Sequence, residues 1–335
     1  MDEKFLYLNK EVVKQCLTPT VVIRTVKKLW SQWNDGKLFE GEHTFLPAGS
    51  HAGNEFLHIP AYLDAQNILG FKWINCYMNP AEGYSFSHGN MILLNDIRTA
   101  SLKAIVSADD ITAMRTAGGH GVAAARILGK KKIRNLAVIG NGNEAYCGIL
   151  GFLSEFPEIC NIQIYCRSRE KYESLLSRVN QAVTEPYMAD KHVKYQKNIE
   201  DIGRDADVIL VATSSPEILL KWEYIEKGTT VIGIDGFIDI DPKCSELADK
   251  WYIVNPETDI KEIIKSGQMS HGYPLKEEKI YGAVPDVIAG KIKGRESEDE
   301  IIIYTHMGAG LYDIACAYET YLKAVEKGIG IELHV

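Results

Sequence analysis

The sequence predicts a two-domain protein of the α/β class, with a doubly wound parallel sheet in one domain and an α+β arrangement in the other. From Leu136 onward, short runs of Val, Ile and Leu alternate with helical segments, as they do where parallel strands are buried on both faces. Before about residue 110, strand-like runs are short and bounded by Gly, Asn or Pro, which favours antiparallel pairing. The length of 335 residues suffices for two domains.

The first domain is expected to begin with a helix and to continue as a mostly antiparallel sheet. The helix spans residues 19–36, because apolar side chains recur at helical spacing between Val21 and Trp30. The expected strands are residues 56–59, 70–75 and 91–96, each bounded by turn-forming residues.

The second part of the chain supplies the parallel strands and the helices between them. The expected strands are residues 136–140, 162–166, 208–212, 230–234 and 251–254, with helices at 144–156 and 169–183. Residues 311–327 form an amphipathic helix that ends before Gly328 and returns to the first domain. Surface loops are expected at residues 276–279 and 290–297. The resulting domains are residues 1–115 with 306–335, and residues 116–305.

The composition argues against several classes of protein. A formal net charge of −8 is unlike the basic surface of a nucleic-acid-binding domain, so we expect no nucleic acid. The first residues lack the pattern of an export signal, and the chain has no apolar stretch of about 18 residues that would predict a membrane span. The seven cysteines are scattered, with no C-x-x-C pair and no Cys/His cluster at metal spacing. We therefore expect a cytoplasmic protein with reduced thiols and no bound metal.

A glycine-rich turn follows the first predicted parallel strand. Its pattern is G-x-G-x-x-A, in which Gly140 permits the tight turn, Gly142 allows close approach of a pyrophosphate and Ala145 allows close packing of the helix. The amide groups at the start of the helix would face the phosphates. This pattern indicates a Rossmann domain that binds a dinucleotide. The expected cofactor contacts are Gly140, Asn141, Gly142, Asn143, Glu144 and Ala145.

The end of the second parallel strand indicates which dinucleotide is bound. NAD-preferring proteins usually carry Asp or Glu there, but this chain has no carboxylate before Glu170. The residues at this position are Cys166, Arg167, Ser168 and Arg169. Two guanidinium groups and a hydroxyl suit a 2′-phosphate, so NADP(H) is favoured and NAD(H) is possible. The polar residues after the strand at 208–212 are further expected cofactor neighbours, namely Thr213, Ser214 and Ser215.

Three further motifs occur in order along the chain. They are Gly70-Phe-Lys-Trp-Ile-Asn75, Ala113-Met-Arg-Thr-Ala117, and Gly294-Arg-Glu-Ser-Glu-Asp299 followed by Thr305-His-Met-Gly-Ala-Gly310 and Asp313. Together with the glycine-rich turn, they resemble the ornithine cyclodeaminase and mu-crystallin family over nearly the whole chain. The tail and the short connection after Gly228 are most similar to siderophore-precursor dehydrogenases, which oxidatively cleave an amino-acid conjugate.

The resemblance implies that the first domain binds the substrate and forms a homodimer. Lys72 and Arg115 would bind the carboxylate of an α-amino acid at the nicotinamide, and Lys72 would also be catalytic. This agrees with the chemistry, because a forked cation suits a carboxylate. Ser87 lies near the position of a substrate-contacting threonine, and His88 could donate a proton. Further implied cofactor contacts are Arg115, Thr116, Met307 and Gly308.

Two aspartates are candidates for the family's catalytic carboxylate. The family carries it in a G-x-D segment, and Asp235 fits that pattern here. The connection from Gly228 to Asp249 is shorter than the family pattern, so Asp239 is the alternative. An arginine that the family carries before the position of Phe56 has no counterpart here, where the sequence is Glu42-His-Thr-Phe45. The family's ornithine-binding set is therefore incomplete, which makes a cyclodeaminase a less favoured interpretation.

Three functions follow from these residues and the resemblance. The favoured function is an NAD(P)-dependent imine reductase or amino-acid dehydrogenase that moves a hydride at the α-carbon of a small amino or imino acid. In it, Lys72 and Arg115 hold the substrate, and Asp235 or Asp239 is the general acid or base. The second function is a cyclodeaminase that uses bound NAD to form proline and ammonia. The third is an NADPH-binding protein like mu-crystallin.

Overall fold

The computed structural model describes residues 4–47, 55–79, 84–87, 89–183, 188, 190–213, 215–271 and 275–334. The chain divides into two compact units, Met1–Arg115 with Ala309–Val335 (unit 1) and Thr116–Gly308 (unit 2). Unit 1 combines an antiparallel sheet with helices, and unit 2 contains a parallel sheet connected by helices. The predicted fold class is therefore confirmed.

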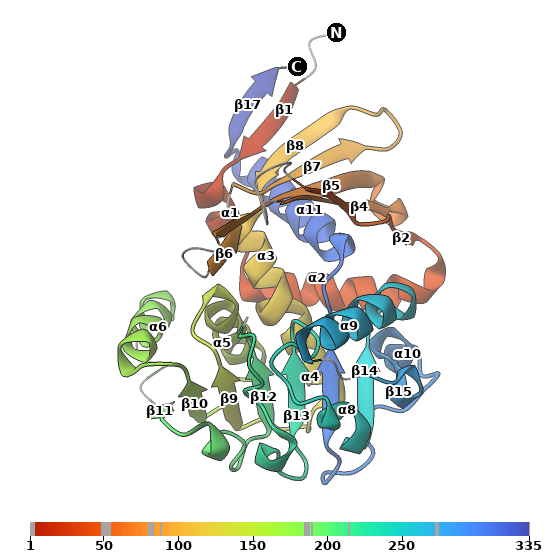
Figure 1. Ribbon diagram of the computed structural model, residues 1–335. Helices are drawn as coiled ribbons and strands as arrows, with labels where there is room; N and C mark the ends of the chain where they lie inside the picture. The colour runs from red at the N-terminus through yellow and green to blue at the C-terminus, as the bar shows by residue number, and fades with distance from the viewer. Residues whose placement is uncertain are drawn as a thin grey trace. The chain divides into compact units, whose positions relative to one another are not determined.

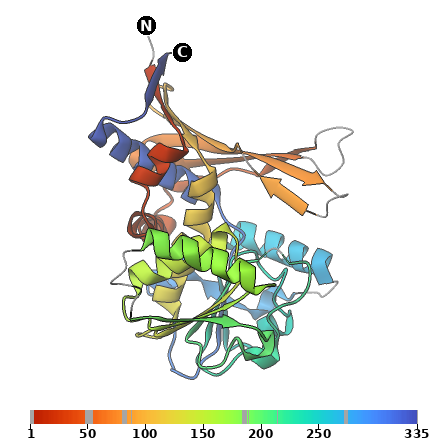
Figure 2. The same ribbon diagram turned by 90° about the vertical axis from the view of Figure 1, so that its left-hand side faces the viewer.

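Unit 1 is built on a sheet with the strand order β17-β1-β8-β7-β5-β4-β2, in which β3 also pairs with β4 and β6 with β5 (Figure 1). The strands are β1 (Lys4–Leu8), β2 (Leu38–Glu40), β3 (Thr44–Pro47), β4 (Glu55–Leu63), β5 (Ile68–Asn79), β6 (Tyr84–Ser87), β7 (Met91–Asp96), β8 (Leu102–Ser107) and β17 (Ile331–His334). Only β1 and β8 pair in parallel among these neighbours. Figure 2 shows β17 beside β1, so both ends of the described chain lie at one edge of this sheet.

The helices of unit 1 are α1 (Lys10–Cys16), α2 (Pro19–Gln32), α3 (Asp109–Arg115) and α11 (Gly310–Lys327). The helix predicted at residues 19–36 ends as an α-helix at Gln32, and a 3₁₀ turn leads to Gly36, whose positive φ of 67° stops it. As predicted, α11 returns from the end of the chain and packs against β4, β5 and α2. A hydrogen bond of 2.8 Å from the Trp30 indole to the Tyr312 hydroxyl joins α2 to α11.

Unit 2 contains a parallel sheet with the order β11-β10-β9-β12-β13-β16-β14-β15 (Figure 1). The strands are β9 (Asn135–Ile139), β10 (Asn161–Tyr165), β11 (His192–Gln196), β12 (Val208–Val211), β13 (Thr230–Gly233), β14 (Lys250–Ile253), β15 (Ile280–Ala283) and β16 (Ile302–Thr305). The sequence prediction found β9, β10, β12, β13 and β14. Four of them are mostly buried on both faces, whereas β10 alternates between buried and half-buried residues. It missed β11 and β15 at the edges, and also β16.

The helices of unit 2 are α4 (Val122–Leu128), α5 (Asn143–Glu155), α6 (Arg169–Ala182), α8 (Lys243–Leu247), α9 (Pro256–His271) and α10 (Val284–Ile288). Residues 290–297 contain no helix or strand, as predicted for a surface loop, and Arg295 is half-buried within them. Its guanidinium donates to the Glu300 carbonyl at 2.6 Å and to the Thr230 hydroxyl at 2.9 Å, which ties the loop to the sheet. Among the described helices of both units, none is long and apolar enough to cross a membrane.

Candidate functional site

The glycine-rich turn between β9 and α5 has the geometry that a dinucleotide diphosphate requires. Gly140 has a φ of 129°, and a Cβ atom there would lie 2.1 Å from the Ala212 carbonyl oxygen, so only glycine fits. Gly142 is the N-cap residue of α5, and a Cβ atom there would meet nothing within 4 Å, which leaves room at the helix start for an anion. Ala145 is fully buried, whereas Asn141 is half-buried in the turn. These residues fit a dinucleotide.

Two of the other predicted contacts in this turn have structural partners. The Glu144 carboxylate accepts a 3.1 Å hydrogen bond from the Ala117 amide, within the π-helical turn η3 (Thr116–Gly121). Glu144 therefore anchors η3, which begins at the buried residue Thr116. The Asn143 side-chain oxygen accepts from the Arg178 guanidinium at 2.9 Å. Arg178 on α6 was not predicted, because only the fold brings its cation beside the glycine-rich turn.

The residues after β10 begin α6. Ser168 is the N-cap of α6, and its hydroxyl accepts a 3.3 Å hydrogen bond from an amide of the first turn. Arg167 is exposed, and Arg169 is 75% exposed with its guanidinium 3.0 Å from the Glu173 carboxylate. Cys166 is buried, and burial raises the pKa of its thiol. Both arginines are thus accessible, while the hydroxyl already caps the helix.

Two other segments predicted to contact the cofactor also follow strands of unit 2. After β12, the Thr213 hydroxyl accepts from the Ser215 amide at 3.1 Å, and Ser214 lies outside the described residues. After β16, Met307 packs against the core of unit 2. Gly308 has a φ of 88°, so the backbone turns there in a conformation that favours glycine.

Unit 1 contains a buried cluster of two cations and one carboxylate. Lys72 Nζ lies 2.7 Å from Asp313 Oδ2, and Arg115 Nε lies 2.9 Å from Asp313 Oδ1. Lys72 lies on β5, Arg115 ends α3 and Asp313 lies in the first turn of α11. The structure therefore brings together the two predicted carboxylate-binding residues. It adds Asp313, which the sequence marked only as part of the tail motif.

The two cations keep the Asp313 carboxylate in its charged form. Burial raises the pKa of Asp313, but the Arg115 and Lys72 charges oppose this effect and hold the pKa below its ordinary value. Asp313 is therefore ionised at neutral pH and forms an ion pair with each cation. The Asp313 carboxylate also fixes both cations in place, so they are ordered before any ligand binds.

A second carboxylate, Glu40 on β2, holds the start of α11. It accepts a hydrogen bond from the Gly310 amide at the helix N-terminus, where the N-cap residue Ala309 provides no side-chain cap. The His43 ring lies 3.4 Å from the same Glu40 oxygen. His43 belongs to the segment that lacks the expected arginine, so a Glu40 and His43 pair occupies that region.

The two candidate aspartates lie in the turn after β13, at the carboxyl edge of the parallel sheet. Asp239 is 3% exposed, and its Oδ2 atom has no hydrogen-bond partner among the described residues. Burial and then the charge of Asp235 raise the pKa of Asp239 to about 8. Asp235 is half-buried. Asp239 is therefore neutral at pH 7 and able to donate a proton.

The remaining predicted substrate contacts are described only in part. Ser87 ends β6 and pairs with Cys76 of β5, but its side chain lies outside the described part of the structure. His88 lies outside it altogether. Both assignments stay predictions.

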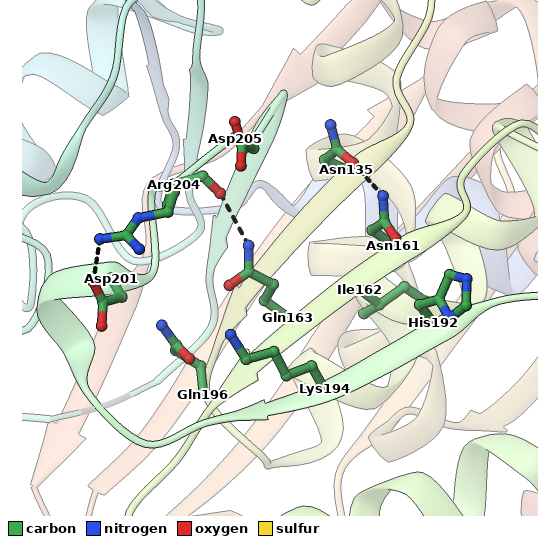
Figure 3. Close-up of a pocket in the computed structure, with 10 residues that line it drawn as sticks. All are labelled: Asn135, Asn161, Ile162, Gln163, His192, Lys194, Gln196, Asp201, Arg204 and Asp205. Carbon is green, nitrogen blue, oxygen red and sulfur yellow. Dashed lines mark hydrogen bonds and ion pairs between the residues drawn. The ribbon is translucent and has the colours of Figure 1, made fainter.

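A cavity of about 270 Å³ lies at the amino-terminal ends of three parallel strands, and Figure 3 shows the residues that line it. Asn135, Asn161 and His192 line it, and these are the first residues of β9, β10 and β11. The connection from β11 to β12 contains a 3₁₀ turn, Ile199–Asp201, and no α-helix in its described residues, so this sheet face is polar and open. The cavity is therefore separate from the glycine-rich turn at the carboxyl ends.

Within the described ranges, no three His, Cys, Asp or Glu side chains are grouped as a metal site.

Comparison with known proteins identifies the family. The model of the ornithine cyclodeaminase/mu-crystallin family matches residues 3–328. The chain belongs to this family, as its motifs predict. It is 26% identical to N-((2S)-2-amino-2-carboxyethyl)-L-glutamate dehydrogenase of Staphylococcus aureus over 100% of both chains.

Two solved structures share the fold. One is the Thermococcus litoralis Δ1-pyrroline-2-carboxylate reductase in complex with NADH and L-proline, with a TM-score of 0.84, 23% identity and coverage of 98% of this chain and 99% of that one. The other is an archaeal alanine dehydrogenase dimer with bound NAD, with a TM-score of 0.83, 24% identity and the same coverage.

Proposed function

We propose that the protein is an NAD(P)-dependent oxidoreductase that acts at the α-carbon of a small amino or imino acid. The observation that carries the proposal is the pair of buried cations, Lys72 and Arg115, that the Asp313 carboxylate holds in one cluster. An ordered guanidinium beside an ordered ammonium suits a ligand with a carboxylate. The names of the relatives support the same class, since they include an amino-acid dehydrogenase and an imino-acid reductase.

Unit 1 would bind the substrate through this cluster. The Arg115 guanidinium, which Asp313 orients through Nε, has the planar geometry that suits a substrate carboxylate. Lys72 would place its ammonium near the reacting carbon. Ser87 and His88 are further proposed substrate contacts, at the end of β6 and directly after it.

Unit 2 would bind the cofactor at the glycine-rich turn, with further contacts from Thr116 and residues 166–169, 213–215 and 307–308. Arg115 of unit 1 is one more proposed cofactor contact. A bound nicotinamide would supply or accept the hydride. We assign the general acid to Asp239, because its buried and protonated carboxyl group lies at the carboxyl edge of the sheet, where ligands of such folds bind. Asp235 would then maintain the raised pKa of Asp239.

We also propose that NADP(H) is preferred to NAD(H). Arg167 and Arg169 are exposed at the start of α6, and Arg169 could exchange its surface ion pair with Glu173 for a 2′-phosphate at small cost. The titles of both related structures name NAD or NADH, so NAD(H) is the alternative to be tested in parallel.

A homodimer through the outer face of the unit 1 sheet is the proposed assembly. Apolar side chains form a continuous surface there: Phe39 stacks on Tyr62 at 5.1 Å, and Tyr62 pairs across strands with Leu69, which is 47% exposed. Monomeric proteins rarely expose large apolar patches.

A Leu69→Glu variant should elute as a monomer in size-exclusion chromatography with light scattering. A Leu247→Glu variant, changed at an exposed leucine on α8, should elute with the wild type; equal behaviour of the two variants would contradict this interface.

The six cysteines whose side chains are described form no disulfide with one another, and we propose a reducing compartment such as the cytoplasm. The function itself is tested by assaying 2-oxo acids with and without amines, together with cyclic imino acids and an N-carboxyalkyl amino acid. NADPH and NADH are used in parallel, and absorbance at the reduced nicotinamide band is followed.

The expected result is steady consumption of reduced cofactor with an imino acid, or its formation from an amino-acid conjugate. Arg115→Gln should raise KM for the acid substrate at least tenfold. Proline and ammonia formed from ornithine without added reductant would instead identify a cyclodeaminase. Tight NADPH binding without turnover of any substrate would identify a binding protein like mu-crystallin.

A further inference from the structure

The end of β16 is fixed by specific partners at three consecutive residues. The Tyr304 hydroxyl lies 3.1 Å from His120 Nδ1, and the Trp251 indole donates to the Thr305 hydroxyl at 2.7 Å. All four side chains are buried in unit 2. The third residue, His306, is paired with a carboxylate through two short contacts.

His306 forms a buried pair with Asp259 of α9. His306 Nδ1 lies 2.7 Å and 2.9 Å from the two carboxylate oxygens, and both side chains are at most 1% exposed. The Asp259 carboxylate also accepts hydrogen bonds from the amides of Val254 and Asn255, at 2.9 and 3.0 Å, just after β14. These backbone donors fix the carboxylate, and the carboxylate in turn fixes the plane of the imidazole.

A second imidazole packs against this pair from η3. The His120 ring meets the His306 ring edge to face, with centroids 4.8 Å apart. His120 lies in the π-helical turn that follows Arg115, and π-helical turns are frequent at functional sites. Elements far apart in the sequence, η3, β16 and α9, therefore meet at the His306 ring.

The residues directly after His306 belong to the proposed cofactor site. Met307 and Gly308 follow without an intervening element, and Gly308 takes the left-handed conformation with a φ of 88°. The paired side chain of His306 on one side and the turn at Gly308 on the other restrict the backbone of Met307. The His306 side chain thus anchors the residue directly before the 307–308 segment.

We propose that His306 and Asp259 are positioning residues that hold the backbone of Met307 and Gly308 in the conformation that contacts the nicotinamide half of the cofactor. The inference rests on the proposed function and goes beyond it, since neither residue touches the reacting atoms. The diphosphate turn at Gly140 is on β9, which β12 and β13 separate from β16 in the sheet. Loss of the pair should therefore weaken binding of the nicotinamide half and spare the adenosine diphosphate half.

The test compares two ligands that differ only in the nicotinamide. NADH and ADP-ribose, and their 2′-phosphorylated counterparts, are titrated into the full-length protein by calorimetry. His306→Leu should weaken NADH or NADPH at least tenfold, which is about 1.4 kcal/mol, and leave ADP-ribose within twofold of the wild type. His306→Asn should restore most of the affinity, because its amide nitrogen can replace Nδ1 as donor to Asp259.

A matched control is His192→Leu, since His192 is exposed on β11 at the other end of the strands. It should leave the affinities for all ligands unchanged. If His306→Leu does not fold, the rescue variant His306→Asn is compared with Tyr304→Phe, which breaks the hydrogen bond to His120 and should weaken NADH more than ADP-ribose.

The outcomes separate this inference from the proposed function. A wild-type protein that binds none of the nucleotides overturns both. A wild type that binds them, with a folded His306→Leu variant that keeps its affinity for the reduced cofactor, overturns the positioning role alone. Equal losses for NADH and ADP-ribose would also overturn it, because they would indicate a general effect on the fold of unit 2.

Discussion

Replacing Asp239 with Asn should remove a pH-dependent cost to stability. The Asp239 carboxyl group is buried beside Asp235, and its pKa in the folded protein is raised from 3.8 to about 8. Between these values the unfolded chain ionises and the folded protein does not. The unfolded state then binds fewer protons than the folded state, so the free energy of unfolding falls as pH rises.

The size of the effect follows from the pKa shift. Each pH unit in the window from about 4 to about 8 costs about 1.4 kcal/mol, so the total has an upper limit on the order of 5 kcal/mol. Above about pH 8 the contribution becomes constant, because Asp239 ionises in both states. Asn has nearly the same volume and does not titrate, so the Asp239→Asn variant should lack this slope.

Urea unfolding at pH 5 to 9 measures the prediction. The difference in unfolding free energy between the variant and the wild type should grow with pH and level off above about pH 8. Asp235→Asn is the control: it removes the like charge and lowers the pKa of Asp239, so its window should end at a lower pH. Parallel pH profiles for wild type and Asp239→Asn would refute the argument.

The same residue gives a prediction for activity. Reduction of an imino acid should slow above about pH 8 as Asp239 loses its proton, and Asp239→Asn should lower kcat about 10²- to 10⁴-fold. Stopped-flow absorbance with saturating cofactor measures this rate. If Asp239→Asn keeps the rate and Asp235→Asn loses it, the acid is Asp235.

Three further changes test other parts of the structure. Asp313→Asn removes the negative charge that two buried cations share, and it should lower the free energy of unfolding by about 3–5 kcal/mol in urea titrations; a loss below about 1 kcal/mol would contradict the buried cluster. Gly140→Ala would place a Cβ atom 2.1 Å from the Ala212 carbonyl oxygen, so fluorescence titration should show no cofactor binding. Replacing Arg167 and Arg169 together with Ala should raise KM for NADPH at least tenfold and leave KM for NADH nearly constant, and a parallel rise in both would exclude a 2′-phosphate contact.

Much of the fold follows from local sequence patterns. The apolar runs of β9, β12 and β13 and the glycines at 140 and 142 report backbone conformation and burial over a few residues, and such information is local. The edge strands β11 and β15 are partly exposed and lack this pattern. Local patterns also gave no sign that Arg295 would be half-buried, because its partners include the Leu128 carbonyl and the Thr230 hydroxyl, which lie far away in the sequence.

The sequence alone determined the family and the glycine-rich turn, and it singled out Lys72 and Arg115 as candidate site residues. The tertiary structure decided what those groups do together. Arg115 and Asp313 are 198 positions apart, and the pair of His306 with Asp259 joins β16 to α9. Charge interactions and burial depend on distances through space, which the order of residues does not specify until the chain has folded. For the same reason the choice of Asp239 over Asp235 required the buried turn after β13.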